Sequence, residues 1–509
     1  MRTALDRQVN GAVRRRLFRE QTTGIYVSYF DVKLSPQLVY HYTVAGSHGL
    51  NVPLVYAMQR IQLDTYLEHA TVTASGGSVA IGMPSGITLA LHGLNAGNLQ
   101  GAQGVIAASG VSLIRPGTGS FDLSGQFKVG YTMSQGVPQI QSFSGRVDGF
   151  DAASLWSIDS GLISAKIGNV RVHATGELEM DENGGVAGTL HDIGVSTSTG
   201  YVHGTISGDF TLPAMNLFHG GQVPWMPGVV DAVHLGYADG SHVEMTGLAA
   251  AVGDIARLAP LALLNDTASN GGDDTFILDI AGNLSSYALI VMTGAGDDRL
   301  TLTGGFRADA QLGDGNDRAT VLAGAHHIDG GAGIDTVVVA GNRAGYDLQM
   351  LATRHVTARA DGTRASLEQV ERVQFADGAV ALDIDGNAGQ AYRLYNAALG
   401  RAPDQAGLGF WIGALDHGGT LLGVADGFMR SDEFMSKFGG SVSDAAFITK
   451  LYEHVLHRQP DTGGYRYWSD ALDAGTARSQ LLVDFSESAE NKALLIGAVR
   501  DGIAYEPFG

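Results

Sequence analysis

The chain has 509 residues, of which 44% are hydrophobic, and its formal net charge at pH 7 is −20. This acidity argues against nucleic acid or an anionic membrane as the main partner, and the hydrophobic content argues against a disordered polymer. Cysteine is absent, so disulfides, thiol catalysis and cysteine-based metal sites are excluded. The length allows about three domains.

Residues 1–27 form a basic N-terminal arm that contains Arg14, Arg15, Arg16 and Arg19. The arm has no apolar core segment, so we do not expect a standard cleaved signal peptide. Two interpretations stay open. The arm is a solvated helix, or it contacts an acidic partner such as a neighbouring copy of the chain or the phosphates of a surface polysaccharide.

Residues 28–245 are rich in glycine and follow a period of two. In "FDLSGQFKVGYTMS" the apolar side chains alternate with polar ones, and many short segments of this kind, separated by glycine turns, predict an all-β domain. No fixed repeat length is visible. The pattern therefore predicts either a β-sandwich or a β-solenoid and does not decide between them.

No catalytic constellation is recognisable in this domain, so the sequence does not identify an enzyme. Neither a nucleophile elbow, a zinc-protease motif, a Walker loop nor a dinucleotide fingerprint occurs. The acidic cluster of Glu177, Glu179 and Asp181 could serve glycoside hydrolysis. Its ordinary explanation is the exposed face of a strand.

Residues 246–265 are apolar but contain Asp254, Arg257 and Pro260. These residues argue against a membrane-spanning segment. We therefore expect a helical linker here and no transmembrane segment in the chain.

The segment 266–340 changes character. Eleven aspartates and no glutamate lie between residues 266 and 335, with three arginines in opposition. Four loops share one frame, and the second glycines of their frames are 24, 19 and 18 residues apart. The loops are Asn270–Phe276, Gly294–Leu300, Gly313–Ala319 and Gly331–Val337.

These loops resemble the calcium-binding nonapeptide repeat of RTX (hemolysin-type) proteins, G-G-x-G-x-D-x-U-x. The resemblance implies a parallel β-roll in which Ca2+ lies between the turns of successive coils, bound by carboxylates and backbone carbonyls. We expect two inter-coil sites, one between Gly296 and Gly315 and one between Gly315 and Gly333. The alternative is a set of ordinary Gly-Asp hairpin turns. The metal-site residues implied by the resemblance are Asp274, Asp298, Asp317, Asp335, Gly294, Gly296, Gly313, Asp314, Gly315, Gly331 and Gly333.

The opposite edge of this roll departs from the repeat. Ala308 and His326 stand where the frame would place an aspartate, so we expect that edge to be free of metal. His326 and His327 could hold a transition metal together with a third ligand. A solvated loop is the simpler interpretation of this pair.

Residues 341–385 resemble the β-rich cap that often follows such repeats. The resemblance rests on the pattern V-E-R-x-Q-F-x-D-G, which begins at Val370 and ends at Gly378. The further Gly-x-Asp turn of the family is replaced by Gly362-Thr-Arg364. We therefore expect no metal site in the cap.

Residues 386–509 predict a helical domain that is duplicated with an offset of 57 residues. Asp404 and Asp461 occupy equivalent positions and can each cap a helix. Trp411 and Trp468 are also equivalent. They fit core positions of these helices, and a carbohydrate-stacking role is the alternative.

The helical duplication resembles the family of domain of unknown function 4214, which is common behind RTX repeats in secreted bacterial proteins. Together the resemblances imply export by type I secretion machinery through an uncleaved C-terminal signal, with the roll folding in extracellular calcium. The expected function is that of a secreted structural or adhesive protein, an adhesin of an S-layer or biofilm matrix. Its partners would be its own copies or cell-surface polysaccharide. The alternative is a secreted polysaccharide-active enzyme or carbohydrate-binding module at 28–245.

Overall fold

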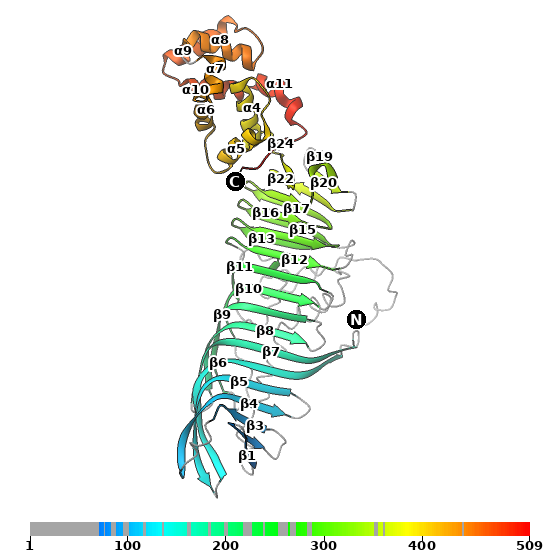
Figure 1. The fold of residues 1–509 in the computed structure, drawn as a ribbon, viewed down its shortest axis with the longest axis vertical. Helices are drawn as coiled ribbons and strands as arrows, with labels where there is room; N and C mark the ends of the chain where they lie inside the picture. Colours follow the sequence, from blue (N-terminus) through cyan, green and yellow to red (C-terminus); the bar gives the residue numbers. More distant parts are fainter. Residues whose placement is uncertain are drawn as a thin grey trace, which may run out of the picture. The chain divides into compact units, whose positions relative to one another are not determined.

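A computed structural model describes residues 71–508 apart from several short segments. These segments are residues 76, 83–87, 95–100, 116–118, 135–136, 160–163, 182–184, 198–201, 217–225, 238–239, 253–262, 265–270, 282–287, 351–354, 360–361 and 440–441. The basic arm at 1–27 lies outside the described residues. The remainder confirms a mainly β chain with an all-α C-terminal region, which appears in yellow to red in Figure 1.

The described residues divide into two compact units. Unit 1 extends to Leu289 and also includes Gly305–Arg307, whereas unit 2 holds Ile290–Gly304 and the chain from Ala308 onward. The expected boundary at residue 265 is therefore not where the compact units separate. The first of the four aspartate loops belongs to unit 1, and the other three belong to unit 2.

Unit 1 is built on a single antiparallel meander, in which each described strand pairs with the next along the chain (Figure 1). Its strands are β1 (Thr71–Ser75), β2 (Ser78–Gly82), β3 (Thr88–His92), β4 (Gln103–Arg115), β5 (Gly119–Ser134), β6 (Val137–Asp159), β7 (Ser164–Met180), β8 (Gly185–Thr197), β9 (Val202–Asn216), β10 (Gly228–Tyr237), β11 (His242–Val252) and β12 (Thr275–Ile280).

This pairing corrects the finer prediction for residues 28–245. The described strands form neither the two facing sheets of a sandwich nor the parallel coils of a solenoid, because consecutive neighbours are antiparallel in one continuous sheet. The period of two correctly predicts strands with one buried face. It indicates which face is buried, but it does not indicate how many sheets the strands form.

The predicted helical linker at 246–265 is also wrong over its first residues, because β11 continues to Val252. Val243 and Met245 point into the core before Gly247, and Leu248 and Ala250 point into it afterwards. Gly247 has a φ of +90°, and the inward set changes from odd to even positions there. This one-residue shift turns an alternating strand into an apparently continuous apolar run.

Unit 2 begins with a parallel β-roll. One sheet contains β14 (Arg299–Gly304), β16 (Arg318–Val321), β18 (Thr336–Val339) and β22 (Arg372–Phe375), which pair in parallel. The other contains β13 (Ala288–Ala295), β15 (Arg307–Asp314), β17 (Ala325–Ala332) and β21 (Arg364–Glu368), and its last three strands are also paired in parallel. Successive strands of the chain alternate between the two sheets, so about 18 residues complete one coil.

The roll is thin because its inward positions carry small and aliphatic side chains. Leu302, Ala310, Ala319, Ile328 and Val337 are all fully buried. Alanine at two of these positions lets the two sheets approach closely, while the β-branched and leucine side chains fill the remaining space. This alternation is what the sequence pattern predicted for the strands between the glycine turns.

The cap closes the roll with antiparallel strands. They are β19 (Tyr346–Met350) and β20 (His355–Arg359) beside β21, and β23 (Gly378–Ala381) and β24 (Ile503–Tyr505) beside β22. A 3-10 turn, η5 (Arg343–Gly345), leads into β19. The strand β24 comes from the far end of the chain, after the helices.

The helical module holds eight helices among the described residues, arranged as two repeats. The first repeat is α4 (Asn387–Leu399), α5 (Gln405–Asp416), α6 (Leu421–Met429) and α7 (Asp432–Phe438). The second is α8 (Asp444–Val455), α9 (Thr462–Asp473), α10 (Arg478–Ser486) and α11 (Ala489–Val499). Every helix of the second repeat begins 57 residues after its counterpart, which confirms the predicted duplication.

Candidate metal site

Four carboxylate residues of unit 2 form a ladder along one edge of the roll. The N–H of Asp298 donates to Asp317 Oδ1 (2.8 Å), and the N–H of Asp317 donates to Asp335 Oδ1 (2.9 Å). The N–H of Asp335 in turn donates to Glu371 Oε2 (2.9 Å). We call Asp298, Asp317, Asp335 and Glu371 the carboxylate ladder. Each rung joins one coil to the next.

A second, exposed row runs beside the ladder. Asp297 Oδ1 accepts a hydrogen bond from the N–H of Asn316 (2.7 Å), and Asn316 Oδ1 accepts one from the N–H of Ile334 (2.9 Å). The adjacent Asp297 and Asp298 therefore have different environments. Asp298 points inward and is 1% exposed, whereas Asp297 lies in the exposed row.

The glycines of the turns stack on one another from coil to coil. Gly315 and Gly333 have φ values of +142° and +141°, which L side chains rarely adopt. A Cβ on Gly333 would lie 1.8 Å from the carbonyl oxygen of Gly315, and one on Gly315 would lie 1.9 Å from that of Gly296. Gly294, Gly313 and Gly331 repeat the arrangement, with corresponding distances of 1.8 and 2.0 Å. Glycine is required here because carbonyl oxygens occupy the space of a side chain.

The ladder leaves buried carboxylate oxygens without hydrogen-bond partners. Asp317 and Asp335 are 1% and 0% exposed, and the Oδ2 atom of each is buried with no hydrogen bond. Burial is the largest cause that raises the pKa of both groups to about 7, and neighbouring carboxylates act in the same direction. An ionised carboxylate that is buried without a partner is costly, so these groups are stable here either protonated or beside a cation.

The donor set of these turns fits a hard cation. Carboxylate and backbone carbonyl oxygens are the ligands that Ca2+ prefers, and it takes six to eight of them. Among the described residues, no three His, Asp or Glu side chains converge as metal ligands. A cation between the coils would therefore complete its shell with glycine carbonyls and water. Asp314 contacts the preceding coil through its backbone, since its carbonyl accepts from the N–H of Gly296 (2.8 Å).

Asp274, the first aspartate of the predicted set, lies in unit 1. It is 0% exposed and directly precedes β12, which pairs antiparallel with β11. A Cβ on Gly247 would approach Asp274 Oδ1 to 3.0 Å. The described part of this first loop therefore leads into an antiparallel strand, unlike the three loops of the parallel roll.

The opposite edge of the roll is closed by His326, which is buried on β17. Its Nδ1 accepts the N–H of Ala308 (3.1 Å), and its Nε2 lies 2.7 Å from the carbonyl oxygen of Ala323. The imidazole thus takes the bridging role that an aspartate oxygen has on the ladder edge, while burial lowers its pKa. His327 points to the other face of the strand, so the two histidines do not converge and the interpretation as a solvated loop is wrong for His326.

Glu371 is the ladder residue that the sequence pattern did not identify. We expected no metal-site residue in the cap, because Glu371 belongs to the cap pattern and the turn before it lacks the Gly-x-Asp motif. Its distance of 36 residues from Asp335 gives no signal, because β19 and β20 are inserted between the two adjacent coils. Parallel pairing of Thr336 with Arg372 places the two acids side by side.

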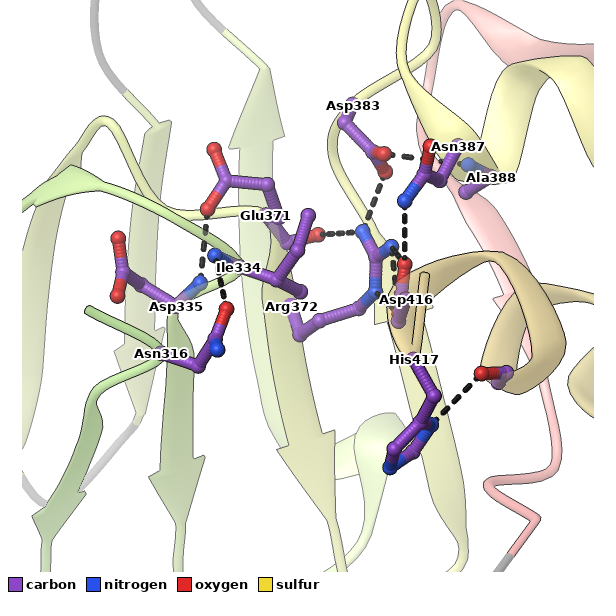
Figure 2. A network of polar contacts seen from close by, with 11 residues as sticks. Asn316, Ile334, Asp335, Glu371, Arg372, Asp383, Asn387, Ala388, Asp416 and His417 are labelled. Atoms are coloured by element: carbon purple, nitrogen blue, oxygen red, sulfur yellow. Dashed lines mark hydrogen bonds and ion pairs between the residues drawn. The ribbon is translucent and has the colours of Figure 1, made fainter. Parts of the chain in front are cut away.

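Next to the ladder, a buried arginine connects the cap to the helical module (Figure 2). Arg372 is 3% exposed and contacts the carboxylates of Asp383 and Asp416, the latter through two nitrogens. Its guanidinium also donates to the carbonyl of Glu371 (2.9 Å). Burial alone would lower the pKa of Arg372, but the two carboxylates outweigh it and raise the pKa. We call Arg372, Asp383 and Asp416 the arginine clamp.

Other candidate residues from the sequence occupy ordinary structural positions. Trp411 packs against Phe428 with ring centroids 4.7 Å apart, and Trp468 packs against Phe485 at 5.2 Å. Asp404 and Asp461 cap α5 and α9 by accepting from Gly407 and Gly464, as predicted. Glu177 and Glu179 lie on the exposed face of β7 opposite the buried Leu178 and Met180, and Asp181 follows the strand.

A family model described as "Domain of unknown function (DUF4214)" matches residues 387–438 and 425–495. The match is confined to the helical module and supports its predicted resemblance. A search of curated proteins gave no match. The resemblance of residues 266–340 to RTX repeats therefore rests on the residues themselves. Within the described ranges, no helix is both long and apolar enough to cross a membrane.

Proposed function

We propose that this chain is a secreted, calcium-dependent structural or adhesive protein of a bacterial cell surface or extracellular matrix, of the S-layer or biofilm kind. The observation that carries the proposal is the carboxylate ladder. Its buried, unpartnered oxygens on Asp317 and Asp335 lie between glycine turns. Two Ca2+ ions, one between the coils of Asp298 and Asp317 and one between those of Asp317 and Asp335, would neutralise them.

Calcium dependence also supports the proposed location. Extracellular modules bind Ca2+ with dissociation constants of about 10⁻⁴–10⁻³ M, far above cytosolic calcium. The roll would be less stable before export and would gain stability outside, because cation binding and folding are coupled. This behaviour suits a type I secretion route, which the RTX resemblance of the sequence also implies.

The meander of unit 1 supports a role in assembly or adhesion. Its exposed face carries carboxylates on several strands, including Glu179 on β7, which lies opposite Arg146, and Asp209 on β9, which pairs with His191. Where exposed carboxylates of two copies meet, they repel each other at low salt, and divalent cations can bridge them. Calcium would thus act twice, within the roll and between copies or toward an acidic surface polysaccharide.

The test is a calcium titration of the purified chain, followed by light scattering on a sizing column. We expect growth into large assemblies as calcium rises to about millimolar, the range of extracellular modules. The variant Asp317→Asn keeps an acceptor for the N–H of Asp298 but removes the charge between the two inter-coil positions. It should need at least about tenfold more calcium, a loss of about 1.4 kcal/mol of binding free energy.

Asp347→Asn is the matched control, because Asp347 is an exposed acid of unit 2 on β19, outside the turns. It should assemble like the unaltered chain. A discrete monomer at saturating calcium would contradict the structural role, and glycan binding or turnover by that monomer would establish the alternative of a carbohydrate-binding module or polysaccharide-active enzyme. If calcium at several millimolar changes neither fold nor size, the metal assignment is overturned as well.

A further inference from the structure

The carboxylate ladder continues beyond the last glycine turn. Its final rung, from Asp335 to Glu371, joins the roll to the cap. Asp335 and Glu371 are connected in both directions. The N–H of Asp335 donates to Glu371 Oε2 (2.9 Å), and the carbonyl of Asp335 accepts from the N–H groups of Glu371 and Arg372 (3.2 and 2.9 Å). The cap therefore supplies a carboxylate at the position where a further coil would place its aspartate.

The turn that delivers Glu371 is short. Asp329 pairs with Glu368, and Thr336 pairs with Arg372. In the roll, six residues lie between Asp329 and Thr336. In the cap, only three residues lie between Glu368 and Arg372. To make this shorter turn, Gln369 adopts a φ of +47°, which a non-glycine residue adopts at a cost. Its side-chain amide donates to the carbonyl of Gly331 (3.2 Å).

Gly330 lies against two oxygens that approach its backbone from neighbouring segments. A Cβ at Gly330 would lie 2.1 Å from the carbonyl oxygen of Gln369 and 2.5 Å from Asp335 Oδ2. Both oxygens therefore face the same side of Gly330. Asp335 is 0% exposed, and its Oδ2 has no hydrogen-bond partner. A buried carboxylate oxygen and a backbone carbonyl thus converge where the chain carries no side chain.

We propose that the roll and the cap together hold a third cation of the calcium type, bound by Asp335, Glu371 and the carbonyl of Gln369. This proposal rests on the proposed function in that Asp335 also serves the second inter-coil position. Two carboxylates and a carbonyl form a set of hard oxygen donors, which water molecules can complete for Ca2+. Unlike the inter-coil positions, this one takes a glutamate and a strained non-glycine turn.

The position has a rigid support on one side. The carbonyl of Glu371 accepts from Arg372, and the same guanidinium is held by Asp416 at the end of α5 (Figure 2). The backbone of Glu371 is thereby fixed from the helical module. A ligand whose backbone is fixed loses less conformational freedom on binding a cation.

Calcium stoichiometry of the full chain tests this proposal, measured by equilibrium dialysis with calcium alone as the probe. Glu371→Gln keeps an oxygen that accepts the N–H of Asp335 but removes the charge, and it should bind one calcium ion fewer. Gly330→Ala should give the same loss by a different route, because its methyl group would displace the carbonyl oxygen of Gln369 and Asp335 Oδ2 while leaving every charge in place. No positive φ is recorded at Gly330, so alanine adds no strain of that kind.

Glu368→Gln is the matched control. Glu368 is an exposed acid at the end of β21, three residues before Glu371, and its variant should keep the full stoichiometry. If Glu371→Gln binds calcium with unchanged stoichiometry and affinity, the proposal is overturned. Glu371 would then serve only to accept the hydrogen bond from the N–H of Asp335. A chain that binds no calcium would overturn this proposal and the proposed function together, whereas a chain that binds calcium but stays monomeric would overturn only the latter.

Discussion

Asp317 shows how much a single side chain of the roll depends on its surroundings. One of its oxygens accepts the N–H of Asp298, whereas the other is buried without a hydrogen bond. In a metal-free chain the protonated form of Asp317 is favoured, because burial and the nearby carboxylates raise its pKa to about 7. The same holds for Asp335.

This shift predicts an unusual pH dependence of the metal-free chain. The unfolded chain ionises these aspartates near pH 4, whereas the folded chain does so near pH 7. Their contribution to the free energy of unfolding is therefore fully present below about pH 4 and is lost as the pH rises to about 7. Urea denaturation of unit 2 in a calcium chelator should give a higher midpoint at about pH 5 than at about pH 8.

The double variant Asp317→Asn with Asp335→Asn controls for the other acidic groups, and its pH dependence over this range should be flatter. Added calcium should reverse the trend in the unaltered chain, since cation binding requires the ionised carboxylates. A metal-free chain that becomes more stable from pH 5 to pH 8 would show that these oxygens are not buried as described.

At this scale, sequence spacing predicted the inward aspartates of the roll but missed the last rung. The motif specifies aspartate after glycine, and Glu371 follows Val370 in a turn without glycine. A longer side chain on a shorter turn reaches the same neighbour, Asp335. Residue-type patterns record neither the length of a turn nor the reach of a side chain, so only the register between β18 and β22 reveals the equivalence.

Single elements of the roll are defined by the close approach of backbones at the glycine turns. Gly333 and Gly341 both have positive φ, but only Gly333 faces a carbonyl oxygen at a short distance. For Gly341, a Cβ would meet nothing within 4 Å. The two positions therefore separate the effect of backbone strain from that of crowding.

We expect Gly341→Ala to cost about 1–2 kcal/mol through backbone strain alone. Gly333→Ala should cost about 1–3 kcal/mol more, because the added methyl group must displace the carbonyl of Gly315 in the neighbouring coil. Calorimetric unfolding of unit 2 measures both. Calcium affinity should fall in the Gly333 variant and stay unchanged in the Gly341 variant; equal effects would mean that the coils can separate freely.

At the scale of elements, the sequence predicted the strands of unit 1 and the duplicated helical domain better than it predicted how the strands assemble. The period of two in β5 is plain, yet it does not specify whether the strands build one sheet or two. In β11 the bulge at Gly247 hides the period altogether. The duplicated helices were predictable because equivalent caps and tryptophans recur at a fixed offset, and both repeats use them in the same contacts.

Across unit 2 as a whole, the arginine clamp joins the cap to the helical module. Arg372→Met should lower the free energy of unfolding by about 3–5 kcal/mol, because it leaves two buried carboxylates without their cation. Arg401→Met is the control. Arg401 forms a comparable pair with Glu433, but its side chain is 39% exposed, and loss of such a pair costs about 0–1 kcal/mol. Chemical denaturation of both variants in saturating calcium makes the comparison, and similar losses would contradict a special role for the clamp.

The pairing of β23 with β24 has a topological consequence for the entire chain. Ala381 lies opposite Ile503 in that pairing, so the polypeptide leaves the cap for the helices and returns to it on adjacent strands. The helical module therefore begins and ends at two adjacent strands of the cap, β23 and β24. A protease that cuts the connection between its repeats leaves each fragment tied to the cap by its own strand, so a single nick severs the chain without releasing either half.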